Sequence, residues 1–121
     1  MTEAEALQFA QKHIETWNSH DLDAIIQLYS ESVELISPLA AALRGSPVVK
    51  GHDALREYFG LGLQKYPNLC FELVNTFLCD SSVTLLFKGA GKRLVAEVLF
   101  IDAAHKVERV YAHYLCASPP R

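Results

Sequence analysis

The sequence has little that would direct it to a charged polymer or a membrane. Its 121 residues carry a net charge of -3 at pH 7, without any cluster of Lys and Arg, so neither nucleic acid nor an anionic membrane is expected as a partner. No apolar run is long enough to span a bilayer, and the acidic segment 1–5 does not resemble a signal peptide. We therefore expect a cytoplasmic, reducing setting.

Cysteine and familiar catalytic motifs are also scarce. Cys70, Cys79 and Cys116 cannot all pair within one chain, and none has the Cys or His spacing of a metal site. We expect reduced thiols, no metal and no other cofactor. The chain has no G-x-S-x-G, no Gly-rich phosphate loop and no H-E-x-x-H, so these motifs give no support to a hydrolase, nucleotide or zinc reading.

Half of the residues are hydrophobic, which is typical of a packed core. No repeat or low-complexity tract divides the chain, and its length fits one domain over residues 1–121.

Three helices are predicted in the first half of the chain. Apolar residues recur every three or four positions over residues 3–19, at Leu7, Ala10, Ile14 and Trp17. A second, short helix follows a cap at Asp21, with the stripe Leu22, Ile25, Ile26 and Tyr29. Gly51 leads into a third helix, which Pro67 stops.

The remaining segments predict strands. One early strand, 33–37, ends at Pro38 and is followed by an apolar loop, 39–50, which suits a lid or a dimer contact and contains Arg44 as a weak candidate for binding a carboxylate. Short turns separate the later strands, 69–79, 83–88, 93–102 and 106–116. The order of elements predicts an α+β domain in which helices cover one face of a curved, mainly antiparallel sheet.

Glu97 is the sharpest candidate for chemistry. It is the only charged residue in the run 94–101, and strand alternation places Leu99 and Ile101 on its face. On the concave face the carboxyl would be buried, its pKa would rise, and it would serve as a general acid or base. The alternative is a solvent-facing Glu97 or one paired with a cross-strand Lys or Arg.

Other candidates for the site are weaker. His13 and Trp17 share a helix face, so His13 would meet a ligand oxygen and Trp17 would form a wall, although a surface or satisfied core histidine is the commoner case. On the last strand Val110, Ala112 and Tyr114 share the expected inner face. Tyr114 would then donate its hydroxyl into a pocket, unless it bonds to neighbouring backbone.

The opposite face of that last strand carries Arg109, Tyr111 and His113. This composition is favoured at interfaces, so we expect a homodimer through the sheet, with plain solvent exposure as the alternative.

The sequence also resembles a known family. The pattern is Trp17-Asn18-x-His20-Asp21-Leu22-Asp23, a strand before Pro38, Gly51 before Leu55-Arg56-x-Tyr58-Phe59, and a last hairpin through Lys106-Val107. It is similar to the nuclear transport factor 2-like superfamily, in the branch of ketosteroid isomerases and SnoaL-like polyketide cyclases, over nearly the whole chain. The resemblance implies a cone in which three helices wrap a strongly bent sheet around an apolar pocket, and a sheet face that often forms dimers.

The resemblance also implies positions for a site. The three polar positions of the isomerases fall on His13, Ser37 and Glu97, and only Glu97 keeps its chemical type. Ser37 stands where a base is needed, and it has no accessible pKa for that role. The His and Asp of the cyclases have no full counterpart, since no Asp follows Asp102, and no Asp-Arg-Asp set of the epoxide hydrolases is found.

Together these observations predict a SnoaL-like protein that binds a small, mostly apolar, carbonyl-containing molecule of polyketide or steroid type. As an isomerase or cyclase-type enzyme it would use Glu97, His13 and Tyr114 for catalysis. The ligand would contact the wall residues Trp17, Ser37, Tyr58, Leu99, Val110 and Ala112. The alternatives are a non-catalytic carrier or sensor, favoured by the missing base at Ser37, and a dimerisation module of the same fold.

Overall fold

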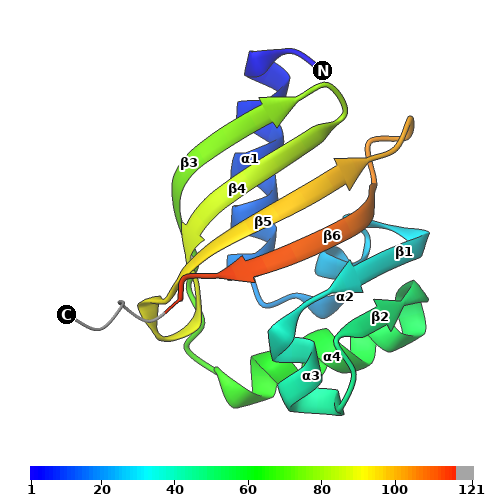
Figure 1. Ribbon diagram of the computed structural model, residues 1–121, viewed down its shortest axis with the longest axis vertical. Helices are drawn as coiled ribbons and strands as arrows, with labels where there is room; N and C mark the ends of the chain where they lie inside the picture. Colours follow the sequence, from blue (N-terminus) through cyan, green and yellow to red (C-terminus); the bar gives the residue numbers. More distant parts are fainter. Residues whose placement is uncertain (117–121) are drawn as a thin grey trace.

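The computed structural model describes residues 1–116 as a curved, unclosed sheet with helices packed on its inner face (Figure 1). In chain order the elements are α1 (Glu3–Asn18), α2 (Leu22–Ile26), β1 (Tyr29–Ile36), α3 (Pro38–Arg44), β2 (Val48–Lys50), α4 (Gly51–Lys65), β3 (Glu72–Cys79), β4 (Ser82–Lys88), the 3-10 turn η1 (Ala90–Lys92), β5 (Leu94–Ile101) and β6 (Val107–Tyr114). The α+β fold class and the cone-like arrangement are confirmed.

The sheet has six strands in the order β2-β1-β6-β5-β4-β3. The later strands form the expected antiparallel meander, and β1 joins it by pairing in parallel with β6. The last strand therefore lies in the middle of the sheet, between the early strand β1 and its hairpin partner β5. No helix of residues 1–116 is long and apolar enough to cross a membrane.

Helix α1 begins with a reciprocal cap. The Thr2 hydroxyl accepts from the Glu5 backbone N–H at 3.1 Å, while the Glu5 carboxylate accepts from the Thr2 N–H at 2.8 Å. The buried face of the helix includes Ala10, Ile14 and Trp17, as expected. Leu7 is 56% exposed, so its assignment to that face is wrong, and Ala6 takes its place one residue earlier.

The segment 39–50 is not a loop, which corrects the prediction. Ser37 caps a helix, with its hydroxyl accepting from Leu39 N–H at 3.2 Å, and Pro38 occupies the first turn, where a missing N–H has no cost. The alanine-rich run that follows favours a helix, and Gly45 ends it at a φ of 82°. The same Ser-Pro pair that ends β1 therefore begins α3.

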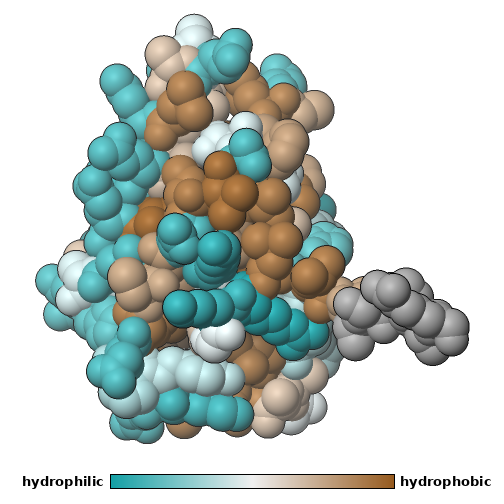
Figure 2. All heavy atoms as spheres, turned by 90° about the vertical axis from the view of Figure 1, so that its left-hand side faces the viewer, coloured by the Kyte–Doolittle hydropathy of each residue, from teal (hydrophilic) through white to brown (hydrophobic). Residues whose placement is uncertain are grey.

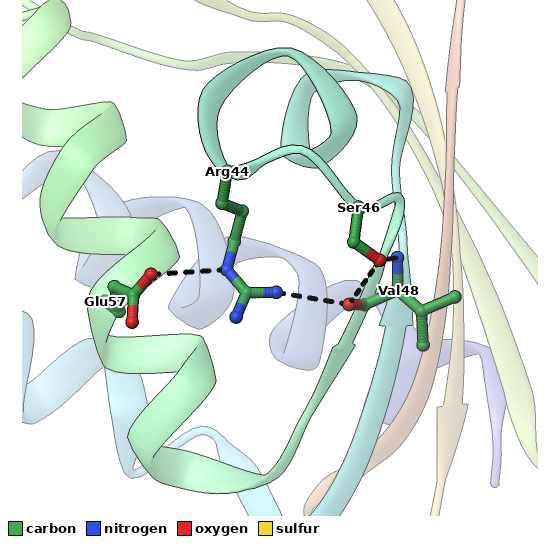
Figure 3. A network of polar contacts seen from close by, with 4 residues as sticks. All are labelled: Arg44, Ser46, Val48 and Glu57. Carbon is green, nitrogen blue, oxygen red and sulfur yellow. Dashed lines mark hydrogen bonds and ion pairs between the residues drawn. The ribbon is translucent and has the colours of Figure 1, made fainter.

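Arg44 holds α3 against its neighbours rather than facing a ligand (Figure 3). Its Nε lies 3.5 Å from the Glu57 carboxylate on α4, and its Nη1 donates to the Val48 carbonyl of β2 at 3.2 Å. Ser46 accepts from the Val48 N–H at 3.2 Å and closes the turn between α3 and β2.

Tyr29 is also placed differently from the prediction. It is the first residue of β1 and not part of the preceding helix. Its hydroxyl accepts from the Trp17 indole N–H at 3.2 Å, deep in the core. The helix ends before it, at Ile26, so the apolar stripe continues without interruption from a helix into a strand.

Candidate functional site

The inner face of the sheet places Glu97 in a pocket. Glu97 lies directly opposite Leu85 on β4 and Ala112 on β6, so the three side chains share one face of the sheet. The pocket opens between the end of α4, the start of α3 and the β4–β5 turn, and has a volume of about 80 Å³. Its walls are mostly apolar and aromatic, and comprise Trp17, Leu35, Ser37, Leu39, Tyr58, Phe59, Gly62, Tyr66, Leu69, Phe71, Phe87, Gly89, Ala90, Val95, Glu97, Ala112 and Tyr114.

The Glu97 carboxylate has neither a hydrogen-bond donor nor a cationic partner among residues 1–116. Burial therefore acts on it without compensation and raises its pKa from 4.5 to about 7. Cross-strand pairing with Lys or Arg, the alternative interpretation of the sequence, does not occur. The side chain is a carboxyl group that can hold or release a proton near neutral pH.

Three hydroxyl groups gather on another wall of the pocket. Ser37 is 1% exposed, and its Oγ lies 3.3 Å from the Tyr58 hydroxyl. Tyr114 interacts with both of these hydroxyls. Burial raises the pKa of Tyr58 and of Tyr114, and the charge of Glu97 adds to the increase for both. The two tyrosines therefore stay protonated at neutral pH and keep O–H groups to donate.

Six of the nine predicted site residues line this pocket, although their roles stay predictions. They are Glu97, Tyr114, Trp17, Ser37, Tyr58 and Ala112. Leu99 and Val110 do not line it. They are directly paired across β5 and β6 on the same sheet face, and both are fully buried away from the opening.

His13 is also separate from the pocket, which corrects its predicted position facing a ligand. Its ring lies between Phe9 and Tyr29, with centroid distances of 5.8 and 5.9 Å. The residue is 2% exposed, and neither ring nitrogen has a hydrogen-bond partner within the described chain. Burial lowers the pKa of His13 to about 4, so the imidazole is neutral at neutral pH.

Several lining residues were missed from the sequence. Val95 could have been found, because it is two positions from Glu97 on the same strand. Phe87 follows in the same way from its neighbour Leu85 on β4. Tyr66, Leu69 and Phe71 come from the segment between α4 and β3. A strand was expected from residue 69, but β3 begins only at Glu72, so strand alternation does not determine how Leu69 and Phe71 point.

No group of three or more His, Cys, Asp or Glu side chains within residues 1–116 is arranged to hold a metal ion. The charged lining consists of Glu97 alone. The arrangement can therefore exchange a proton with a bound molecule and donate hydrogen bonds to an oxygen of that molecule.

The chain is similar in sequence and in fold to known proteins. The model of the SnoaL-like domain matches residues 10–114. The chain belongs to the SnoaL-like family. A SnoaL-like protein of unknown function from Burkholderia thailandensis E264 is 34% identical and has a TM-score of 0.90, with 95% of this chain and 98% of that one covered.

Two further structures share the fold of this SnoaL-like protein at lower identity. SalBIII, an epoxide hydrolase/cyclase-like enzyme of pyran ring formation in salinomycin, is 16% identical with a TM-score of 0.70 over 93% of this chain and 92% of its own. TerC, crystallised with polyporic acid, is 9% identical with a TM-score of 0.73 over 90% of each chain. No curated protein matches the sequence.

Proposed function

We propose that this SnoaL-like protein binds a small, mostly apolar carbonyl compound in its pocket and that Glu97 transfers a proton to or from it. The observation that carries the proposal is the unpaired Glu97 carboxyl in an otherwise uncharged, largely aromatic pocket. A general acid or base works best when its pKa lies near the working pH, which a value of about 7 satisfies.

The hydroxyl groups supply the second part of the chemistry. The Glu97 carboxylate would take a proton from the carbon next to the carbonyl. The electron pair of the broken C–H bond would form a C=C bond to the carbonyl carbon, and the π pair of the C=O bond would move onto the oxygen to give an enolate. When two hydrogen bonds link Ser37, Tyr58 and Tyr114 in a chain, one O–H remains for this oxygen. Glu97, now a carboxylic acid, would return the proton to the same or another carbon, as an isomerase or cyclase requires.

This division of roles differs from that predicted from the sequence. His13 would not polarise the ligand, because it lies outside the pocket, and Tyr58 and Ser37 take that role beside Tyr114. With serine at position 37, Glu97 is the only group of the lining suited to act as the base. The names of SalBIII, a cyclase-like enzyme, and of TerC, crystallised with an organic ligand, support a ligand pocket in this fold.

Exchange of ketone α-hydrogens in D₂O tests the proposal without knowledge of the natural substrate. We expect the protein to accelerate exchange of acetone and cyclohexanone, measured by proton NMR, with a rate that rises as pH passes about 7. Glu97→Gln should lower the rate about 100-fold or more. The matched control, Glu34→Gln on the outer face of β1, should leave it unchanged. Equal rates for the wild type and Glu97→Gln would refute the assignment of Glu97.

A carrier or sensor is the second candidate, and the absence of a base at Ser37 favours it. In that case ketone binding, measured by saturation-transfer NMR, would survive Glu97→Gln and no exchange would occur in either protein. A dimerisation module without a ligand would show neither binding nor exchange.

The sheet also supports the proposal of a homodimer. Its outer face carries a cross-strand row of Phe77, Thr84, Val98, Tyr111, Ile36 and Val48, none of which is buried. Phe77 is 55% exposed, and Figure 2 shows hydrophobic side chains gathered on the side of the molecule where β3 lies. A second copy would cover such a surface.

Sedimentation equilibrium tests the dimer. We expect Tyr111→Asp, in the middle of the row, to weaken association at least about tenfold, because it buries an unpaired charge. Gln64→Asp introduces the same charge at an exposed residue of α4, on the helical side of the sheet and away from the row, and should have no effect. A monomeric wild type at micromolar concentration, or equal effects of the two variants, would contradict the dimer through the sheet.

A further inference from the structure

The corner between α1 and α2 has no part in the proposed proton transfer, yet it is tied to the pocket wall. The Asn18 side chain pairs with the backbone of Phe71 in both directions. Its Nδ2 donates to the Phe71 carbonyl at 2.9 Å, and its Oδ1 accepts from the Phe71 N–H at 2.6 Å. One side chain thus satisfies both polar groups of a residue that lies 53 positions away.

His20 makes a second tie nearby. Its Nε2 lies 2.6 Å from the Leu69 carbonyl oxygen. Since a carbonyl only accepts, Nε2 carries the proton and donates it. The backbone of His20 has a φ of 59°, a left-handed conformation that histidine tolerates better than most residues. The turn therefore aims the ring at the same segment that Asn18 holds.

The segment held in this way is a wall of the pocket. Tyr66, Leu69 and Phe71 all line the cavity. Residues 66–71 belong to no helix or strand. Within this segment the Leu69 N–H donates a backbone hydrogen bond to the Tyr66 carbonyl at 3.0 Å. The other walls come mainly from α4 and from the paired strands. The segment 66–71 is therefore the part of the wall that depends most on side-chain ties.

The cavity is small, so a larger ligand that is to lie wholly inside it needs part of the wall to move. An apolar cavity that holds benzene measures about 150 Å³, whereas this pocket has about 80 Å³. A molecule with a six-membered ring, such as cyclohexanone, is therefore fully enclosed only when part of the wall moves outward. Displacing a sheet strand would break a ladder of backbone hydrogen bonds, while displacing residues 66–71 breaks three side-chain bonds and at most the one backbone bond from Tyr66 N–H to the Gly62 carbonyl.

We propose that residues 66–71 form the moving wall of the pocket, and that Asn18 and His20 are positioning residues that set how readily it opens and so which molecules enter. The inference rests on the pocket being the ligand site of the proposed function. It assigns a role to the Trp17–Asp21 run, whose side chains at positions 18 and 20 bind the wall while Trp17 packs on Phe71 at a centroid distance of 5.4 Å.

Trp17 makes the opening measurable, because it is the only tryptophan and lines the pocket beside Phe71. Acrylamide, a small neutral quencher, reaches it when the wall opens. Asn18→Ala leaves both backbone groups of Phe71 without partners in the closed form, so we expect about a tenfold larger open population and a matching rise in acrylamide quenching. His20→Leu should act in the same direction.

Two variants serve as controls. His20→Gln keeps a side-chain donor for the Leu69 carbonyl and shares the backbone cost of His20→Leu, so it should restore low quenching. Ser19→Ala removes hydrogen bonds to Thr16 and Asp21 at the same corner but none to residues 66–71, and should behave as the wild type.

Amide hydrogen exchange distinguishes local opening of residues 66–71 from a general loss of stability caused by the substitution. In Asn18→Ala we expect faster exchange confined to residues 66–73, with the central strands unchanged. Unchanged quenching in both Asn18→Ala and His20→Leu would overturn the proposal, as would faster exchange spread evenly over the sheet. Acrylamide quenching does not depend on catalysis, so the two proposals are tested independently. Unchanged quenching would overturn the moving wall even if Glu97 catalyses the exchange of acetone hydrogens. Absence of that exchange would contradict the role of Glu97 even if the quenching changes as expected.

Discussion

Replacing Glu97 by Gln should change how the stability of the protein depends on pH, because Glu97 and His13 act on it in opposite directions. Neither group has a compensating partner among the described residues; His13 is buried in the core, and Glu97 is partly buried in the pocket wall. Burial raises the pKa of Glu97 from 4.5 to about 7 and lowers the pKa of His13 from 6.5 to about 4. Each shift makes the free energy of unfolding depend on pH.

The pH dependence of the free energy of unfolding has opposite signs for Glu97 and His13. Between pH 4.5 and about 7 the folded Glu97 keeps a proton that the unfolded chain has lost, so its contribution to stability is lost as the pH rises. Between pH 6.5 and about 4 His13 is protonated in the unfolded chain but stays neutral in the folded protein. Its contribution to stability is therefore lost as the pH falls. In the overlap, from 4.5 to 6.5, the two contributions nearly cancel in the wild type.

The magnitude follows from the pKa values. One pH unit corresponds to about 1.4 kcal/mol for a single proton, so each group changes the free energy of unfolding by about 3 kcal/mol across its window. Relative to the wild type, Glu97→Gln should gain about 3 kcal/mol as the pH rises from 4.5 to 7. His13→Leu, which removes the buried nitrogens, should gain a similar amount as the pH falls through the His13 window.

Urea denaturation at one protein concentration, followed by circular dichroism from pH 4.5 to 7.5, measures these differences. Subtracting the wild-type curve removes the contribution of the remaining acids, which all three proteins share. Difference curves of opposite slope for the two variants are the expected result. Flat difference curves, or curves of the same slope, would refute the claim that both groups are shielded from solvent and unpaired.

Two further substitutions test other parts of the structure. Ser37→Ala should lower the free energy of unfolding by about 1 to 2 kcal/mol, because it removes the cap of α3 as well as the bond to Tyr58; a loss below about 0.3 kcal/mol in urea melts would contradict the cap. Arg44→Met should cost about 1 kcal/mol or less, since Glu57 is largely exposed, and it should leave ketone exchange unchanged, because Arg44 does not line the pocket; slower exchange would place Arg44 in the site after all.

The sequence predicted most of the fold because its strongest signals are periodic. The helix that starts at Gly51 and stops before Pro67, and the strands of the meander, follow from apolar spacing together with Gly, Pro and short turns, although β3 begins at Glu72 and not at residue 69. The helix after Ser37 was missed because proline was interpreted only as the end of a strand. In fact Ser37, Pro38 and Gly45 form a start and stop signal for a short helix.

The site was predictable to the extent that strand alternation decides it. The inward orientation of Glu97 and Tyr114 follows from residues that alternate on one strand. Alternation says which face of the sheet a residue is on, but not how far along the strand the pocket extends. Leu99 and Val110 therefore share the face of Glu97 and still do not line the pocket. The position of His13 depends on how α1 is rotated against the sheet, which a helix stripe determines only to within about one residue.

The central position of β6 has a consequence for synthesis of the protein. Because β6 lies between β1 and β5, the two parts of the sheet are joined only when residues 107–114 are available. During translation β1 has no partner on that side until Tyr114 leaves the ribosome, although β1 itself emerged about 80 residues earlier. The buried side chain of Leu35, which already faces Val49 of β2, stays without its β6 neighbour Val110 for that time, and a chaperone that shields it would raise the folding yield.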